Sequence, residues 1–390
     1  MWEFCCTFAT TFRQESQSKN KTKYRMIHST IDTTIVAQAH RLIAGAHNIV
    51  IFTHIAPDGD AMGSSLAMKH WIRMKMKDER MKDEVTVITP NTFPDFLAWL
   101  PGAKEIVVYE GHEAQADRLI AEADLHICLD FNEPKRIGPA GEKLMQNTCP
   151  KLLIDHHLMC DDAWLHANEQ SVTISHPEAS STCELVYRVI RTEMKDERMK
   201  DEEVLDTSIA TCIYTGLMTD TGNFSYNSNN PDLYEMIADL MRAGINKDAI
   251  YNDVFNQYSE DRVRLMGYCL YRKMRLFPKH HLALIALSEE ELERFNFRPG
   301  DTEGIVNIPL QISDVYYSVF MREQPPKPGT TKPVIKVSFR SQGDRPVNIF
   351  AHEVFRGGGH ANASGGEFYG TLGQAVLLFE KHYPKYLKKE

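Results

Sequence analysis

Short apolar runs alternate with helical patterns over the first 230 residues. The run at 48–54 (NIVIFTH) is followed by a Gly/Asp/Pro cluster and then by a helical pattern from Met62 onward. The same alternation predicts further strands at 85–89, 106–109, 125–130 and 152–156, and helices at 113–123, 180–191 and 205–218. Such alternation is typical of a parallel sheet with helices on both faces. We therefore predict a Rossmann-like α/β domain over residues 26–230.

The pattern changes in the last third of the chain. Residues 231–275 are mostly helical in pattern and predict a connector between two domains. Strands are then predicted at 281–287, 315–321 and 334–339, with a loop at 324–332 and a helix near 347–355. This order predicts a smaller α/β domain with a mixed sheet over residues 276–390.

Two segments stand outside this plan. Residues 1–25 lack the basic start and apolar stretch of a signal peptide, and they predict a disordered extension. The nine residues MKDERMKDE occur twice, at 76–84 and 194–202. Their charges alternate in sign, which predicts a solvated helical extension to which we assign no function.

Composition excludes two classes of protein. With a mean hydropathy of −0.37 and no apolar run near the ~18 residues that a membrane helix needs, the chain is not an integral membrane protein. The net charge of −9 lacks the basic footprint of a protein that holds long nucleic acid. The acidity belongs to residues 26–275, since residues 276–390 carry 14 basic and 13 acidic side chains. Eight cysteines without a CxxC pair predict reduced thiols and a cytoplasmic protein.

Acidic and histidine side chains gather at or just beyond the ends of predicted strands or in the loops between elements, Asp220 lying between a helix and a turn. In chain order they are His54, Asp58 and Asp60 in HIAPDGDAMGS, Asp130 in LHICLD, Asp155, His156 and His157 in LLIDHH, and Asp220 in TGLMTDTGNF. Gly63 and Ser64 are expected to open the helix after the first group, where a helix start favours anions. A single aspartate at such a place is more often a helix cap, and a lone histidine pair is more often surface or satisfied core.

Taken together, these side chains predict a metal site. The carboxyl ends of parallel strands meet at one edge of a sheet, where ligands bind. Burying this many carboxylates without cations would be very costly. Mixed oxygen and nitrogen ligands favour Mn²⁺, with Mg²⁺ as the alternative, whereas structural zinc sites prefer Cys and His. Two such ions about 3.5–4 Å apart suit in-line displacement at phosphorus.

A fifth segment lies near the C-terminus. Arg356 is followed by Gly357, Gly358, Gly359 and His360. A glycine run exposes backbone N–H groups that can cradle a phosphate, although it can also be a simple tight loop. Upstream, Arg340 and Ser341 lie at a predicted strand end, where Arg340 is a candidate fork for a phosphate.

The five motifs in this order resemble the DHH phosphoesterase superfamily with its DHH-associated C-terminal domain. The resemblance extends over residues 30–385, and within the superfamily the chain looks most like the compact nanoRNase/pAp phosphatases. The resemblance implies that His54 and Asp58 bind one metal ion, that Asp60, His156 and Asp220 bind the other, and that Asp130 bridges both. It implies that Asp155 orients a ligand histidine and that His157 contacts the phosphate or assists proton transfer. It also implies that the nucleotide is held between the domains by Arg340, Ser341, Gly357, Gly358, Gly359 and His360.

The resemblance also implies an activity. We expect a manganese-dependent phosphoesterase that cleaves short oligoribonucleotides to 5′-mononucleotides and 3′-phosphoadenosine 5′-phosphate (pAp) to AMP, with no membrane partner. A soluble cyclic-di-AMP or pApA phosphodiesterase is the main alternative, and a non-catalytic nucleotide sensor is an alternative of another class. Two other members of the superfamily fit this sequence less well. RecJ-like exonucleases usually carry an additional OB-fold domain, for which this chain has no room, and family II pyrophosphatases lack the GGGH loop that this chain has. The order of substrate preference, the cleavage polarity, the native metal and a homodimer remain open.

Overall fold

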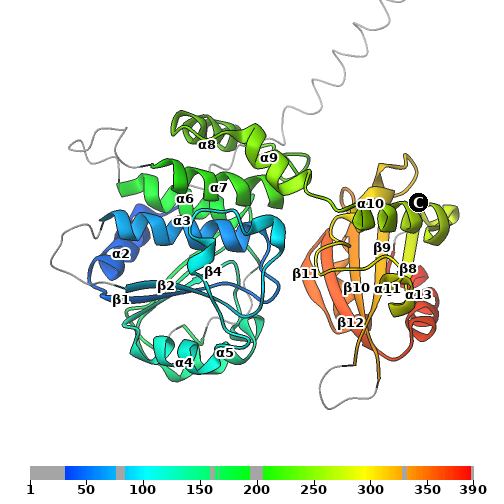
Figure 1. Cartoon of the computed structure of the whole chain (residues 1–390), viewed down its shortest axis with the longest axis horizontal. Coiled ribbons are helices and arrows are strands. Elements are labelled where there is room, and N and C mark those ends of the chain that lie inside the picture. The colour runs from blue at the N-terminus through cyan, green and yellow to red at the C-terminus, as the bar shows by residue number, and fades with distance from the viewer. Residues whose placement is uncertain are drawn as a thin grey trace, which may run out of the picture.

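The computed structural model describes residues 31–75, 84–158, 163–165, 167–193, 205–326 and 332–387. The predicted extension at 1–25 and nearly all of both MKDERMKDE copies lie outside the described residues. Two six-stranded sheets make up the fold, one in each half of the chain (Figure 1). The predicted α/β architecture is therefore confirmed, whereas the exact domain boundaries remain a prediction.

The first sheet is entirely parallel. Its strands are β1 (Asn48–Phe52), β2 (Glu84–Thr89), β3 (Val107–Val108), β4 (Leu125–Leu129), β5 (Lys151–Asp155) and β6 (Val172–Ser175). Their order is β3-β2-β1-β4-β5-β6, so the direction of winding reverses between β1 and β4. All predicted strands of this sheet are present within a few residues. The four-residue β6 was not predicted, because so short a run carries little periodic signal.

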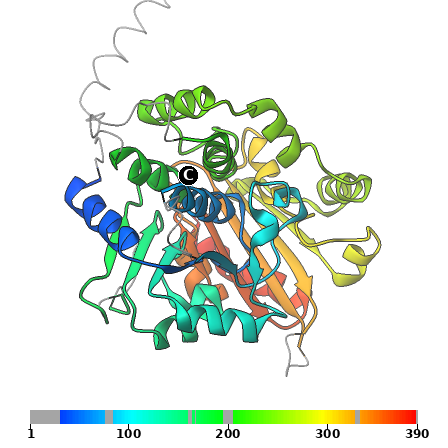
Figure 2. The ribbon, with the colours of Figure 1, turned by 60° about the vertical axis from the view of Figure 1, so that its left-hand side comes forward.

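Helices cover both faces of the first sheet. On one face lie α2 (Thr33–Ala44), α3 (Gly59–Lys75), α6 (Thr182–Glu193) and α7 (Thr207–Asp220), and on the other lie α4 (Glu113–Glu122) and α5 (Pro139–Gln146). Ile49 and Ile51 of β1 pack under the first group, whereas Val50 and Phe52 pack against the second. Figure 2 shows the two layers from another side, with the green helices above the sheet and the teal helices below it.

Close packing of α3 against α7 corrects one prediction. The helix begins at Gly59, so Gly63 and Ser64 lie in its second turn and do not open it. A Cβ atom at Gly63 would lie 2.5 Å from the carbonyl oxygen of Cys212 in α7. Gly63 therefore allows the close contact between two helices. The first turn of α3 carries Asp60, so a side-chain carboxylate lies at the helix start that was expected to favour an anionic ligand.

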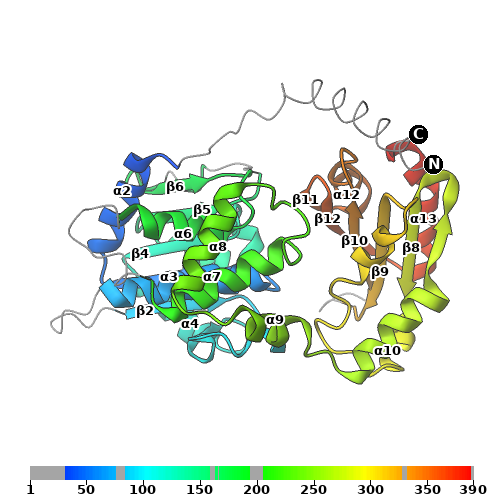
Figure 3. The same ribbon diagram turned by 90° about the horizontal axis from the view of Figure 1, so that it is seen from above.

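A helical connector leads to the second sheet (Figure 3). It consists of α8 (Pro231–Arg242), α9 (Lys247–Phe255), α10 (Glu260–Tyr268) and the π-helical turn η4 (Cys269–Lys273). Short 3₁₀ helices elsewhere are η1 (Asp95–Leu97), η2 (Ala103–Glu105), η3 (Pro134–Ile137), η5 (Pro278–His280) and η6 (Ile305–Gln311). Within the described ranges, none of the helices has the length and apolar character needed to cross a bilayer.

The second sheet is mixed, as predicted. Its order is β11-β12-β10-β9-β8-β7, with β8 and β9 parallel and the other neighbours antiparallel. The strands are β7 (Arg275–Phe277), β8 (Leu282–Leu287), β9 (Tyr317–Gln324), β10 (Val334–Ser341), β11 (Gly358–His360) and β12 (Ala363–Tyr369), and the helices are α11 (Glu289–Glu293), α12 (Asn348–Phe355) and α13 (Leu372–Tyr386). The strands β7, β11 and β12 were missed by the sequence analysis.

The glycine run forms part of this sheet. Gly358 and Gly359 pair with β12 in the edge strand β11, so the run is more than a loop. A Cβ atom at Gly357 would lie 1.7 Å from the carbonyl oxygen of Gly365, and Gly359 has φ of 132°. Close approach of two backbones and a left-handed conformation thus explain these glycines without a ligand.

Candidate metal centre

The predicted metal-binding side chains meet at the carboxyl edge of the first sheet. His54 follows β1 and Asp130 follows β4, the two strands between which the winding reverses. Ligands bind at this point in open α/β sheets because the two loops diverge there and leave space. Asp60 enters from the first turn of α3, and Asp220 enters from the last residue of α7.

One group of donors consists of His54, Asp58 and Asp130. The Nε2 atom of His54 lies 3.2 Å from Oδ2 of Asp130 and 3.9 Å from Oδ1 of Asp58. The Nδ1 atom of His54 is 2.9 Å from the carbonyl oxygen of Ile55, which orients the ring and leaves Nε2 facing the carboxylates. All three ligand atoms lie within 4.8 Å of one another, a separation that one metal ion can span.

A second group consists of Asp60, His156 and Asp220. The Nε2 atom of His156 lies 3.8 Å from Oδ2 of Asp60 and 3.5 Å from Oδ2 of Asp220. Its Nδ1 atom is 3.3 Å from the carbonyl oxygen of Ala179, so this ring is oriented in the same way as that of His54. These three ligand atoms also lie within 4.8 Å of one another.

Asp130 stands between the two groups. Its Oδ2 atom faces His54, whereas its Oδ1 atom lies 3.6 Å from Nε2 of His156. Asp130 has φ of 64°, a left-handed conformation that is uncommon for a residue with a side chain. This backbone turn ends β4 and directs the carboxylate toward both histidines. One carboxylate oxygen for each group is the arrangement that a bridging ligand requires.

The N-terminus of α6 holds Asp60, a feature that the sequence analysis missed. The backbone N–H groups of Thr182 and Cys183 donate to the two carboxylate oxygens of Asp60, over 2.6 and 2.8 Å. The hydroxyl of Thr182 also donates to Oδ1 of Asp130 over 3.0 Å. The signal in the sequence is the run SST before a helix, but such residues usually cap their own helix.

The charges of the cluster fit divalent cations. Burial and the charge of Asp130 raise the pKa of Asp60 to about 7, and burial also raises the pKa of Asp220 well above its usual range. Burial opposes protonation of His54, but its hydrogen bond to Asp130 and nearby carboxylates raise its pKa to about 9. Among the described residues, no lysine or arginine forms an ion pair with these carboxylates. The protein thus gathers buried oxygen and imidazole donors whose charge protons or metal ions would offset.

Asp155 and His157 form a hydrogen-bonded pair beside the cluster. The Nδ1 atom of His157 lies 2.8 Å from Oδ1 of Asp155, and Asp155 is fully buried at the end of β5. Asp155 therefore orients His157, whereas the carbonyl of Ala179 orients His156. Because Nδ1 faces Asp155, the Nε2 atom of His157 is the one left to act on a ligand.

Residues of the second sheet reach this site. The ring of His360 stacks on that of His157, with centroids 4.8 Å apart and planes 21° apart, and lies 5.2 Å from the ring of His156. Burial and the two neighbouring histidines lower the pKa of His360 to about 4. Burial lowers the pKa of Arg340, while the nearby Tyr226 and Asp220 oppose that shift, so Arg340 of β10 lies near the end of α7. Its Nη1 atom donates to the carbonyl oxygen of Phe339 over 2.9 Å.

The other predicted phosphate-binding residues are not brought to the cluster by any contact. Ser341 alternates with Arg340 along β10, so its side chain points to the opposite face of the sheet. Its hydroxyl is buried, and it has no hydrogen-bond partner among the described residues. Gly357, Gly358 and Gly359 are fixed by β12 as described above.

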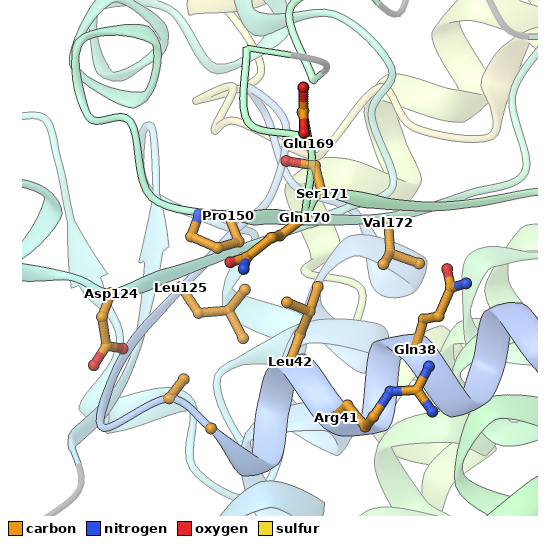
Figure 4. Close-up of a pocket in the computed structure, with 12 residues that line it drawn as sticks. Gln38, Arg41, Leu42, Asp124, Leu125, Pro150, Glu169, Gln170, Ser171 and Val172 are labelled. Atoms are coloured by element: carbon orange, nitrogen blue, oxygen red, sulfur yellow. The ribbon is translucent and has the colours of Figure 1, made fainter.

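A separate pocket lies at the opposite edge of the first sheet (Figure 4). It has a volume of about 590 Å³, and its lining includes Leu42 of α2, Asp124 before β4 and Ser171 before β6. It contains none of the predicted site residues. Asp124 accepts hydrogen bonds from the backbone N–H groups of His47 and Asn48, so this carboxylate has a structural role.

Comparisons with known proteins agree with this geometry. The family model for the N-terminal domain of the DHH family matches residues 48–217. The chain is 28% identical, over 86% of its length and 88% of the relative's, to the bifunctional oligoribonuclease and PAP phosphatase NrnA of Thermus thermophilus. It is 26% identical to the protein of that name from Bacillus subtilis, over 84% of this chain and 92% of the relative. A crystal structure of an exopolyphosphatase-related protein from Bacteroides fragilis matches with a TM-score of 0.81 and 45% identity, over 92% of this chain and 98% of that one.

Proposed function

Because the chain belongs to the DHH family of phosphoesterases, we propose that it hydrolyses short oligoribonucleotides to 5′-mononucleotides and pAp to AMP. The names of the relatives from Thermus thermophilus and Bacillus subtilis support these two substrates, and each alignment covers most of both chains. Phosphodiester and phosphomonoester substrates require the same attack at phosphorus, so a single site can serve both.

The position of Asp130 carries this proposal. One buried carboxylate faces two histidines with its two oxygens, and each histidine belongs to a separate group of metal donors. Two divalent cations held there would bind the phosphoryl oxygens and offset the negative charge that develops at phosphorus. We propose Mn²⁺ as the native ion, because the donors mix imidazole with carboxylate.

The remaining side chains would act directly on the substrate. His157, oriented by Asp155, would donate a hydrogen bond or a proton to the phosphoryl group through Nε2. His360 is uncharged at neutral pH and stacks on His157, so it would limit the water around that ring. Arg340 would bind a phosphate as a fork beside Asp220. We also propose that the Gly357–His360 segment contacts the substrate through its backbone.

The charge distribution favours small substrates. Residues 26–275 carry the net negative charge of the chain, and this charge disfavours tight binding of long nucleic acid. We propose a cytoplasmic location, since the described cysteines at 128, 149, 183, 212 and 269 are free thiols. A homodimer is compatible with this function but is not required by the site.

A substrate panel tests the proposal. The full chain is incubated with Mn²⁺ or Mg²⁺ and with pAp, a diribonucleotide, a five-residue RNA or cyclic-di-AMP, and the products are separated by chromatography. We expect AMP from pAp and 5′-mononucleotides from the dinucleotide. Hydrolysis of cyclic-di-AMP alone would replace the proposed function with the cyclic-dinucleotide alternative. Nucleotide binding without turnover under either ion would indicate a sensor.

A further inference from the structure

The loop between α7 and α8 carries an aromatic side chain for which the proposed mechanism has no role. Tyr226 lies six residues after Asp220, and 53% of its surface is exposed. Burial and the charges of Asp220 and Asp58 raise the pKa of Tyr226, while the charge of Arg340 opposes that shift. The next residue ties the loop to the metal centre, because Nδ2 of Asn227 donates to the carbonyl oxygen of Ala179 over 3.4 Å and the same carbonyl lies 3.3 Å from Nδ1 of His156. Tyr226 therefore lies next to the metal centre.

The loop holds this ring in a fixed place. Gly222 has φ of 55°, and a Cβ atom there would lie 2.3 Å from Cε1 of Tyr226, so the ring rests against the backbone of Gly222. The N–H groups of Ser225 and Tyr226 both donate to the carbonyl oxygen of Thr221, over 2.9 and 3.2 Å. These contacts order the loop before any ligand arrives, which lowers the entropic cost of binding.

Backbone strain in the same loop supports a role beyond connection. Phe224 has φ of 62°, although a bulky residue rarely adopts the left-handed conformation. Its ring packs 5.8 Å from that of Tyr214 in α7, and its N–H donates to the hydroxyl of Thr221 over 3.0 Å. Strained backbone of this kind persists where the surrounding structure fixes it, and it concentrates at functional sites.

We propose that Tyr226 is the platform on which the nucleobase of the substrate stacks, a proposal that rests on the function given above. The metal centre recognises a phosphate and has no means of recognising a base. An aromatic ring that rests on the backbone of Gly222 and is half exposed offers a flat surface near the place where that phosphate would bind. Every nucleobase has a π-face, so such a platform binds a nucleotide without selecting one sequence. The chemical class recognised is therefore a nucleotide with an intact base.

Two variants separate stacking from hydrogen bonding. Tyr226→Phe keeps the ring and removes the hydroxyl, whereas Tyr226→Leu removes the ring. Tyr234→Leu is the matched control, because Tyr234 is 50% exposed but lies on α8. Binding of AMP and of ribose 5-phosphate, which lacks the base, is measured by calorimetry with the full chain in the presence of Mg²⁺.

We expect Tyr226→Leu to weaken AMP binding about 10–100-fold while leaving ribose 5-phosphate unchanged. Tyr226→Phe and Tyr234→Leu are expected to bind AMP within about twofold of the parent chain. The stacking role would be overturned if Tyr226→Leu lost equal affinity for both ligands or lost none for AMP. It would also be overturned if Tyr226→Phe lost as much affinity for AMP as Tyr226→Leu. So would a parent chain that binds AMP no more tightly than ribose 5-phosphate.

The binding assay also separates this inference from the proposed function. A parent chain that prefers AMP through Tyr226 but hydrolyses neither pAp nor a dinucleotide would retain the platform and lose the proposed activity. In a chain that is active, Tyr226→Leu is expected to raise the KM for pAp by about the same factor as the loss in binding, with little change in kcat, since stacking is equal in the ground and transition states.

Discussion

The backbone N–H of Thr182 lies 2.6 Å from Oδ2 of Asp60, and the hydroxyl of the same threonine lies 3.0 Å from Oδ1 of Asp130. One residue at the start of α6 thus fixes a carboxylate of one donor group and the carboxylate that faces both groups. All three residues are almost completely buried. The spacing of the two donor groups therefore depends on α6 as well as on the loops that carry the donors themselves.

Removing the hydroxyl of Thr182 is expected to weaken metal binding. Thr182→Val keeps the shape of the side chain and leaves Asp130 without that hydrogen bond. Loss of a partner that orients a metal ligand typically costs 10–100-fold in metal affinity or activity. Calorimetric titration with Mn²⁺ measures the affinity, and Thr182→Ser, which retains the hydroxyl, is the control. Equal affinities for the valine and serine variants would show that the backbone N–H groups alone position the cluster.

Replacing Asp130 with asparagine is expected to abolish hydrolysis. The variant keeps the size of the side chain but loses the charge that faces both His54 and His156. We expect kcat/KM for pAp to fall by more than about 100-fold, because both donor groups are affected at once. This loss is larger than the one expected for a residue that only orients a metal ligand, such as Thr182. Asp248→Asn is the control, since Asp248 is exposed on α9 and pairs only with Lys247 among the described residues. Activity near that of the parent chain would refute the role of Asp130 as the shared ligand.

The sequence indicates part of the site clearly, because some of the donors end or follow a strand whose apolar pattern is clear, whereas Asp60 and Asp220 lie on helices. His54, Asp130 and Asp155 could be placed at one sheet edge from the alternation of strands and helices alone. Their partners could not be placed in this way. Thr182 acts through a backbone N–H at a helix start, and Tyr226 acts from an irregular loop, so neither has a periodic signal.

The helix start at Gly63 was misplaced for a related physical reason. Glycine near a Pro/Asp cluster usually marks a turn, but Gly63 is required by the distance between two helices. The edge strand β11 was read as a loop because three glycines carry no alternation. Both errors arise where close approach of two backbones, and not the local pattern, determines the residue.

Adding one methyl group at Gly63 is expected to destabilise the fold. Alanine favours a helix over glycine by about 1 kcal/mol, but its Cβ would lie 2.5 Å from a carbonyl oxygen of α7. Overpacking of this kind costs about 1–3 kcal/mol, so we expect a net loss in the free energy of unfolding. Gly267→Ala in α10 is the matched control, because nothing lies within 4 Å of its Cβ position, and it should stabilise the chain by about 0.5–1 kcal/mol. Denaturant unfolding measures the free energy of unfolding of both variants and of the parent chain. If Gly63→Ala proved more stable than the parent chain, α3 and α7 would have room to move apart, and the packing role of Gly63 would be refuted.

Divalent cations are expected to stabilise the chain more strongly at high pH. In the protein alone, the pKa values of His54 and His156 are raised from about 6.5 to about 9, and that of Asp60 is raised from 3.8 to about 7. Between pH about 6.5 and about 9, His54 and His156 therefore keep protons in the folded chain that the unfolded chain has lost, so the stability that these groups contribute falls as the pH rises through that interval. Below about 6.5 the raised pKa of Asp60 is opposed by the lowered pKa of His360. Metal ions compete with the same protons, and their stabilisation grows as the protons leave. Thermal unfolding at about pH 6 and about pH 9, with Mg²⁺ or with a chelator, measures both effects. We expect a larger rise in Tm with Mg²⁺ at the higher pH and little rise at either pH for Asp130→Asn. A rise that is equal at both pH values in the parent chain would show that these groups do not hold the ions.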